Sequence, residues 1–140
     1  MKVLFDTNVI IDLLVNRTEH YSDCRYLLNK VINEEIDGYI SSKQVTDVYY
    51  ILRKYIHDNR SRMETIRLIC ETFKILPLLP SDIKYCLNTD FDDFEDAVIE
   101  EAAKVNMISH IVTNNIKDFE KSDLVITSPA ELRQLLSVGE

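Results

Sequence analysis

Acidic side chains fall at four places in this chain from which they could act together on a metal ion. Asp6 directly follows the first apolar run, and Asp47 lies in an amphipathic segment after a second short strand-like run. Asp96 ends an acidic stretch, and Asp118 belongs to a polar segment that begins at Thr113. Carboxylates in one place repel each other unless a cation is present. Hard oxygen ligands without cysteine or histidine favour Mg²⁺ or Mn²⁺, and such a site suits hydrolysis of a phosphodiester.

Each of these acids, taken alone, also has an ordinary structural explanation. Asp6 can cap the helix that follows it. Asp47 can pair with Lys43, one helical turn away on a solvated face. The polar segment that begins at Thr113 can be a simple turn. It is the shared placement of the acids, rather than any single residue, that favours a site.

The acidic stretch from residue 90 to residue 96 carries two different signals. Acids near the start of a helix complement the helix dipole, which accounts for Asp92 and Asp93. Asp96 instead shares its side of the helix with Ile99 and Ala103, at the edge of the apolar face. Asp96 is therefore the better candidate for a functional carboxylate.

Strand-like and helix-like segments alternate along the whole chain, which predicts a parallel sheet with helices on both faces. We expect residues 1–140 to form one α/β domain. We also expect Asp6, Asp96 and the polar segment to meet at one rim, because functional residues gather where strand order reverses. The expected strands are 3–5, 39–40, 75–79, 109–112 and 124–126, and the expected helices are 9–14, 19–35, 43–56, 62–73, 80–88, one ending near 106, and 128–136.

Three details of this pattern concern boundaries. The pair Asp37-Gly38 is expected to end a helix, and residues 59–61 are expected to break the chain between two helices. Pro77 interrupts its strand, which predicts an edge position.

Composition limits the alternatives. Two glycines and three prolines are too few for a sandwich or barrel with many tight turns. A net charge of -8 counts against nucleic-acid binding unless bound metal ions supply positive charge. Three scattered cysteines argue against a zinc site or a disulfide framework and suggest a reducing cytoplasm. No apolar run is long enough to span a membrane, so we expect no membrane partner.

The acidic segments resemble the motifs of the PIN domain family, in particular the toxin ribonucleases of the VapC type. The resemblance covers nearly the whole chain, in order and with suitable spacing. It lies in residues 6–12, 46–47, 93–97 and 112–119.

This resemblance implies a three-layer α/β/α fold with a central, mostly parallel sheet, and an endoribonuclease that uses Mg²⁺ or Mn²⁺ to cut RNA. It also implies an antitoxin protein as partner and, in many relatives, a homodimer. The implied catalytic residues are Asp6, Asp47, Asp96 and Asp118, the implied metal ligands are Asp6, Asp93, Asp96 and Asp118, and the implied supporting residues are Thr7, Asn8, Thr113 and Asn115.

The sequence departs from the family pattern at two positions. Asp47 stands where the family usually has the longer glutamate. Asn115 stands where many members have an aspartate, so the fourth acidic position is open between Asp118 and a neutral Asn115.

Three other classes of protein share parts of this pattern. A dehalogenase-type phosphatase needs a second aspartate two residues after the first, where this chain has Asn8. A receiver-type signalling domain needs a pair of acids after the first strand and an aspartate after a middle strand, and neither is present. A PIN-fold binding module without activity remains an alternative, because fold does not guarantee chemistry.

Overall fold

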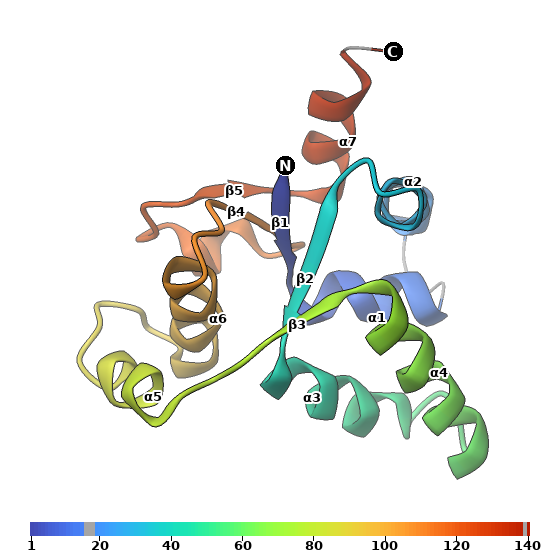
Figure 1. The fold of residues 1–140 in the computed structure, drawn as a ribbon, viewed down its shortest axis with the longest axis horizontal. Coiled ribbons are helices and arrows are strands. Elements are labelled where there is room, and N and C mark those ends of the chain that lie inside the picture. Colours follow the sequence, from blue (N-terminus) through green and yellow to red (C-terminus); the bar gives the residue numbers. More distant parts are fainter. Residues whose placement is uncertain (16–18, 139) are drawn as a thin grey trace.

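A single parallel sheet forms the centre of the molecule. The computed structural model describes residues 1–15, 19–138 and 140. Five strands lie in the order β3-β2-β1-β4-β5, and all neighbouring pairs are parallel (Figure 1). The strands are β1 (Lys2–Phe5), β2 (Asp37–Ser41), β3 (Lys74–Leu76), β4 (His110–Val112) and β5 (Val125–Thr127).

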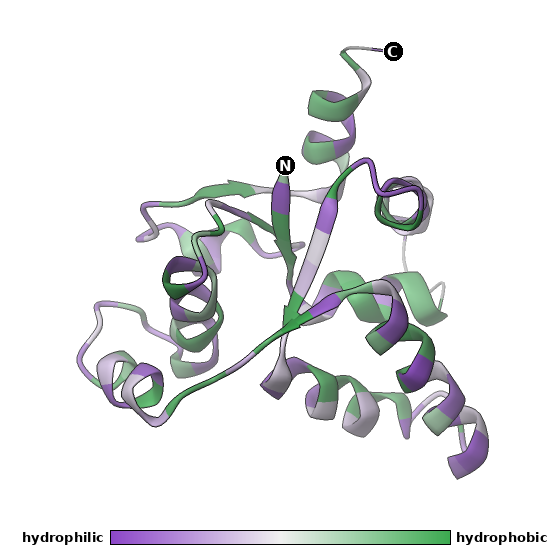
Figure 2. Cartoon of the chain, in the orientation of Figure 1, coloured by the Kyte–Doolittle hydropathy of each residue, from purple (hydrophilic) through white to green (hydrophobic). Residues whose placement is uncertain are grey.

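Helices cover both faces of this sheet, as the alternating pattern predicted. One core joins α1, α2, α3, α4 and α7 to the face that carries Val3 and Phe5, and a second core joins α6 to the face that carries Leu4. Figure 2 shows α1 as largely hydrophobic, in keeping with the burial of Val9 and Ile10. The helices are α1 (Thr7–Val15), α2 (Tyr21–Ile32), α3 (Ser42–Leu52), α4 (Asn59–Thr72), α5 (Pro80–Cys86), α6 (Phe94–Val105) and α7 (Pro129–Ser137), with a 3₁₀ helix η1 (Ile116–Phe119).

Strand order reverses at the central strand. From β1 the chain adds β2 and then β3 on one side, and it returns to add β4 and β5 on the other. Leu4 pairs with Ile111 and Phe5 pairs with Val112, so β1 and β4 end side by side. Ligand sites of open parallel sheets lie at such a reversal, outside the carboxyl ends of the strands.

The predicted end of the second helix is wrong. Helix α2 ends at Ile32, and the chain turns through Glu34, a non-glycine residue with a positive φ of 58°. Gly38 lies inside β2, where a Cβ atom would come within 2.9 Å of side-chain atoms of Phe73 and Val31. This glycine therefore serves close packing of a helix on the sheet rather than a turn.

The predicted break at residues 59–61 is also wrong. Asp58 is the N-cap of α4 and accepts a hydrogen bond from the Ser61 backbone at 3.0 Å, so these polar residues begin the helix. The strand β3 ends at Leu76, before Pro77, and lies at the edge of the sheet as predicted. In the part of the chain that the structure describes, no helix is both long and apolar enough to cross a bilayer.

Candidate active site

Asp6 lies between the end of β1 and the start of α1. Its backbone N–H donates to the Val112 carbonyl at 2.9 Å, which extends the pairing of β1 with β4 by one residue. Its own carbonyl accepts from Val9 and Ile10, which begins α1. The residue is only 6% exposed. Asp6 thus holds the N-cap position that the sequence allowed, and it also stands at the point of strand reversal.

Three donors surround the Asp6 carboxylate. The Thr7 backbone donates to Oδ1 at 2.7 Å, and Oδ2 accepts from Thr113 Oγ1 at 2.7 Å and from Asn8 Nδ2 at 3.2 Å. Burial nevertheless raises the pKa of Asp6, and the charge of Asp118 adds to this effect. Three of the four predicted supporting residues therefore contact Asp6 directly.

A second set of polar contacts holds the loop after β4 against α1. Asn8 Oδ1 accepts from the Asn114 backbone at 3.2 Å, and Asn114 Nδ2 donates to Asp12 Oδ2 at 2.5 Å. The Asn115 backbone donates to Thr113 Oγ1 at 3.0 Å. The sequence prediction gave Asp12 and Asn114 no role. An aspartate inside the apolar run of α1 was the signal that could have identified this contact.

Gln44 attaches α3 to the end of β1. Its side chain completes a capping box, because Oε1 accepts from the Ser41 backbone at 2.7 Å while Ser41 Oγ accepts from the Gln44 backbone at 3.3 Å. Its Nε2 donates to the Phe5 carbonyl at 2.7 Å and to Thr7 Oγ1 at 3.3 Å. Gln44 was also missed at the sequence level. It fixes the start of the helix that carries Asp47 relative to Asp6.

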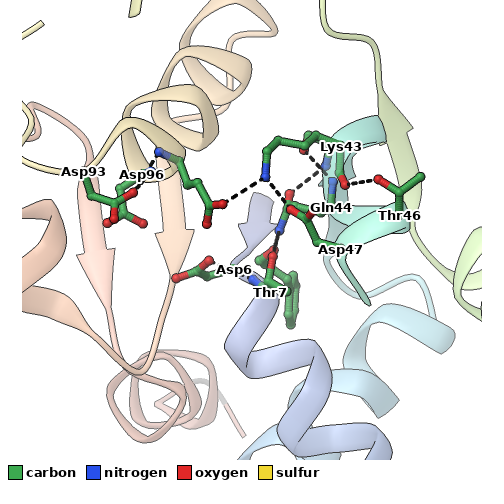
Figure 3. A network of polar contacts seen from close by, with 11 residues as sticks. Asp6, Thr7, Lys43, Gln44, Thr46, Asp47, Asp93 and Asp96 are labelled. Carbon is green, nitrogen blue, oxygen red and sulfur yellow. Dashed lines mark hydrogen bonds and ion pairs between the residues drawn. The ribbon is translucent and has the colours of Figure 1, made fainter. Parts of the chain in front are cut away.

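Asp47 forms the predicted pair with Lys43, and the pair faces a cavity. Lys43 Nζ lies 2.5 Å from Asp47 Oδ2 and 3.7 Å from Glu95 Oε1 on α6. Figure 3 shows Lys43 and Asp47 of α3 on one side, Asp93 and Asp96 at the start of α6 on the other, and Asp6 between them. Asp47 therefore forms an ordinary ion pair within its helix and also lines the candidate site.

The start of α6 presents two further acids. Asp93 is the N-cap, and its Oδ1 accepts from the backbones of Glu95 at 2.8 Å and Asp96 at 3.2 Å. Asp96 lies in the first turn, beside the buried Ala97. Its pKa is raised to about 7, first by burial and then by the charges of Asp6, Asp93, Asp118 and Glu95. A carboxylate whose pKa is raised this far by burial and by neighbouring acids is typical of a functional site.

Asp6, Asp47, Asp93 and Asp96 line one cavity of about 460 Å³. The two candidates for the fourth acidic position, Asp118 in η1 and Asn115 before it, both line it. Within the described ranges, no three carboxylate, histidine or cysteine side chains stand close enough to hold a metal ion as they are placed. Six carboxylates line the cavity: Asp6, Asp47, Asp93, Glu95, Asp96 and Asp118.

A larger depression of about 970 Å³ lies elsewhere, between the end of α2, the end of α4 and the beginning of β2. Asp37 and Lys74, which line it, pair with each other at 3.0 Å. This depression lies at the amino end of β2, and the six carboxylates lie at the carboxyl side of the sheet. We therefore place the candidate chemistry in the smaller cavity.

Comparison with known proteins agrees with this arrangement. A family model described as PIN domain matches residues 2–117. The chain belongs to the PIN domain family. The PIN fold also accounts for the three layers and the all-parallel sheet described above.

Several PIN-domain proteins are similar over nearly their full length. The protein named Ribonuclease VapC1 from Aquifex aeolicus is 24% identical over 135 residues, which are 93% of this chain and 92% of that protein. A toxin–antitoxin complex from Klebsiella pneumoniae contains a chain that is 26% identical, with a TM-score of 0.64 and coverage of 91% of this chain and 97% of that one. VapC20 of Mycobacterium tuberculosis, a toxin that cleaves the sarcin-ricin loop, is 11% identical with a TM-score of 0.69, and the match covers 88% of this chain and 96% of VapC20.

The residues of this PIN domain fit a hard divalent cation. Ribonucleases of the VapC type depend on a divalent metal ion. The candidate ligands here are carboxylate oxygens, which is the donor set that Mg²⁺ and Mn²⁺ prefer. Burial is the first cause of the raised pKa of Asp96, and repulsion by the neighbouring acids adds to it. A bound cation would relieve that repulsion.

Proposed function

We propose that this PIN-domain protein is a metal-dependent endoribonuclease and the toxin of a toxin–antitoxin pair. The observation that carries the proposal is the cavity at the reversal of strand order. There, two partly or fully buried aspartates, Asp6 and Asp96, both have raised pKa values. The name of the Aquifex aeolicus relative, a ribonuclease, supports the choice of RNA as substrate.

Mg²⁺ or Mn²⁺ would be held by Asp6 and Asp96, with Asp118 and Asp93 as further ligands. Both backbone hydrogen bonds to Asp93 go to Oδ1, which leaves its Oδ2 for a ligand. A bound ion supplies a Lewis acid that polarises the phosphate and lowers the pKa of an attacking water. Closing these acids around one ion requires side-chain rotations, for which the exposed Asp118 has room.

The chain's own residues orient and charge this site. Thr7, Asn8 and Thr113 fix the Asp6 carboxylate by the three hydrogen bonds described above. Asp96 must give up its proton to bind a cation, and below a pH of about 7 it holds that proton. Hydrolysis then adds water across the phosphodiester and leaves a phosphate on one fragment and a hydroxyl on the other.

A protein antitoxin is the proposed partner. The Klebsiella pneumoniae relative was solved as a toxin–antitoxin complex. The net charge of -8 on this chain would attract a basic partner segment by electrostatic complementarity. The expectations of a homodimer and of a cytoplasmic location stay predictions.

A PIN-fold binding module without activity is the second candidate. The specific observations that favour it are the short Asp47, which is engaged by Lys43, and the neutral Asn115 in the cavity. In that case the protein would bind RNA or a partner without cutting it.

Cleavage of a labelled RNA by purified protein separates these candidates. We expect cleavage with Mn²⁺ or Mg²⁺, no cleavage with EDTA, and at least a hundredfold loss in Asp6→Asn purified in the same way. Equal cleavage by wild type and Asp6→Asn would indicate a contaminating nuclease. Absence of cleavage by wild type with either ion would contradict the proposal and favour the binding module.

A further inference from the structure

The carboxylates of the cavity carry more negative charge than one divalent ion can neutralise. Six carboxylates line the cavity, and the whole chain carries a net charge of -8. The proposed substrate is a polyanion whose phosphates must be brought beside these acids. Of the lysines and arginines in the described part of the chain, Lys43 alone lines the cavity.

Lys43 is held in a way that allows exchange of its partners. Its ammonium lies 2.5 Å from Asp47 and 3.7 Å from Glu95, and its side chain is 31% exposed. Ion pairs that reach solvent contribute little stability, so replacing one carboxylate by a phosphate costs little. An ammonium has three donors and can keep one carboxylate while it binds a phosphate oxygen.

Tyr50 lies two turns further along the same face of α3. The spacing of Lys43, Asp47 and Tyr50 places all three on one side of the helix, and all three line the cavity. Tyr50 is 66% exposed. The Arg53 guanidinium lies 5.8 Å from the centre of the Tyr50 ring. The guanidinium covers one face of this exposed ring, and the other face is open for stacking a base of a single strand, as aromatic rings among cations commonly do.

We propose that a bound RNA strand runs from the carboxylates along α3. Lys43 binds one phosphate of this strand, and one of its bases stacks on Tyr50. This inference rests on the proposed function for the identity of its ligand. Lys43 and Tyr50 are seven residues apart, a rise of about 10 Å along a helix, which a nucleotide or two can span. Asp47 and Glu95 hold the Lys43 ammonium until the phosphate arrives.

Salt dependence of RNA binding tests the phosphate contact. Binding of a short fluorescent RNA is measured by anisotropy over a series of salt concentrations, with Ca²⁺ in place of Mg²⁺, and each sample is checked for intact RNA. The magnitude of the slope of log affinity against log salt should fall by about 0.7 in Lys43→Gln, because one phosphate contact to a single strand is lost. Lys2→Gln removes the same charge at the opposite end of β1 and should leave the slope unchanged.

Two matched tyrosine variants test the stacking contact. Tyr50→Leu should weaken RNA binding about tenfold, whereas Tyr50→Phe, which keeps the ring, should bind nearly as wild type does. Tyr85 on α5 is 60% exposed but does not line the cavity, so Tyr85→Leu is the control for loss of an exposed ring. Thermal melting of each variant checks that it is folded.

The outcomes separate this inference from the proposed function. If Lys43→Gln changes Mn²⁺ affinity in calorimetry and leaves the RNA salt slope as in wild type, Lys43 is only the counter-ion of Asp47 and the inference is overturned. Cleavage by wild type together with unaltered binding by Lys43→Gln and Tyr50→Leu overturns the inference and leaves the nuclease standing. The expected binding losses without any cleavage by wild type support the inference and contradict the nuclease. Wild type that binds no RNA overturns both.

Discussion

The Asp6 carboxylate keeps its place by accepting hydrogen bonds from protein donors in a position that water scarcely reaches. Burial raises its pKa, and the Thr113 hydroxyl is the neighbour that does most to lower it again. Removing that hydroxyl therefore makes the ionised carboxylate less favourable. Groups that orient a metal ligand typically affect metal affinity by about 10- to 100-fold.

For this reason we expect Thr113→Val, which keeps the side-chain shape, to bind Mn²⁺ at least about tenfold more weakly than wild type at neutral pH. Isothermal calorimetry measures this affinity. Thr65→Val on α4 is the control, since Thr65 only donates to the Ser61 carbonyl of its own helix. Equal Mn²⁺ affinity in wild type and Thr113→Val would remove the hydroxyl from any role in the site.

Asp96 makes the stability of the metal-free protein depend on pH in a defined direction. Its pKa rises from 3.8 to about 7 on folding, so between these values the folded chain binds more protons than the unfolded chain. The free energy of unfolding must then fall as pH rises through this interval, and it stays low above pH 7. Burial raises the pKa of Asp6 in the same direction.

Urea unfolding in EDTA from about pH 5 to pH 8 checks this prediction. Asp37 and Asp58 have lowered pKa values and act in the opposite direction, so the quantity to compare is the difference between wild type and Asp96→Asn. We expect the loss of stability with rising pH to be smaller in Asp96→Asn. Parallel curves for the two proteins would show that Asp96 does not carry the effect.

At the residue scale, the sequence was sufficient to identify those acids whose type and position along the chain point to the site. Asp6 was predictable because it follows the first strand, and Asp96 because it lies at the edge of an apolar helix face. The contact of Lys43 with Glu95 was not predictable, because it joins side chains of two helices whose relative placement depends on the sheet. The same is true of Gln44, whose acceptor in Phe5 is 39 residues away.

The helix α3 is positioned by one buried amide. Gln44 is 1% exposed and bonds to Ser41, to Thr7 and to the Phe5 carbonyl. Leucine is similar in size, but it would leave the Ser41 N–H and the Phe5 carbonyl without these bonds. A buried polar group left without its partner costs about 1–3 kcal/mol.

We therefore expect Gln44→Leu to lower the free energy of unfolding by about 1–3 kcal/mol. Because α3 also carries Asp47, RNA cleavage should fall further than the remaining folded fraction explains. Urea titration and initial cleavage rates measure the two effects. Gln134→Leu on α7 is the matched control, since Gln134 is exposed. A Gln44→Leu protein as stable as wild type would contradict this role.

At the element scale, the order and type of the helices and strands were predictable, because apolar periodicity is a local property. The predicted helix boundaries were wrong where the residues at the boundary suit two different structural roles. Asp58 and the residues after it suit a break and a helix start equally well, and only the following turn of helix decides. Gly38 was expected to end a helix, although its small size serves the packing against Phe73.

The molecule as a whole gathers much of its negative charge in one place. The chain has 24 acidic residues, and six of them line a single cavity. The net charge of -8 counted against a nuclease at the sequence level, because composition does not show where the acids lie. In the folded chain the same acids become an argument for cation binding.

A ligand that binds only the folded state raises the stability of the whole chain. Mn²⁺ at about 100 times its dissociation constant should increase the free energy of unfolding by about 2.7 kcal/mol. Thermal melting with and without Mn²⁺ measures this gain. We expect most of it to disappear in Asp6→Asn, while Asp123→Asn, which lies outside the cavity, should keep it. An equal gain in wild type and Asp6→Asn would place the bound ion elsewhere.

The hydrogen bond from Thr113 to Asp6 joins residues 107 positions apart in the chain. During synthesis, Asp6 is made long before β4 and the loop that follows it. Until then the first aspartate lacks both its neighbouring strand and its hydroxyl donor, and Asp96 has not yet been positioned against it. The proposed nuclease activity would otherwise be available against the message and the ribosome that produce the chain. The strand order of this fold therefore delays assembly of the site until the chain has been made through the loop after β4.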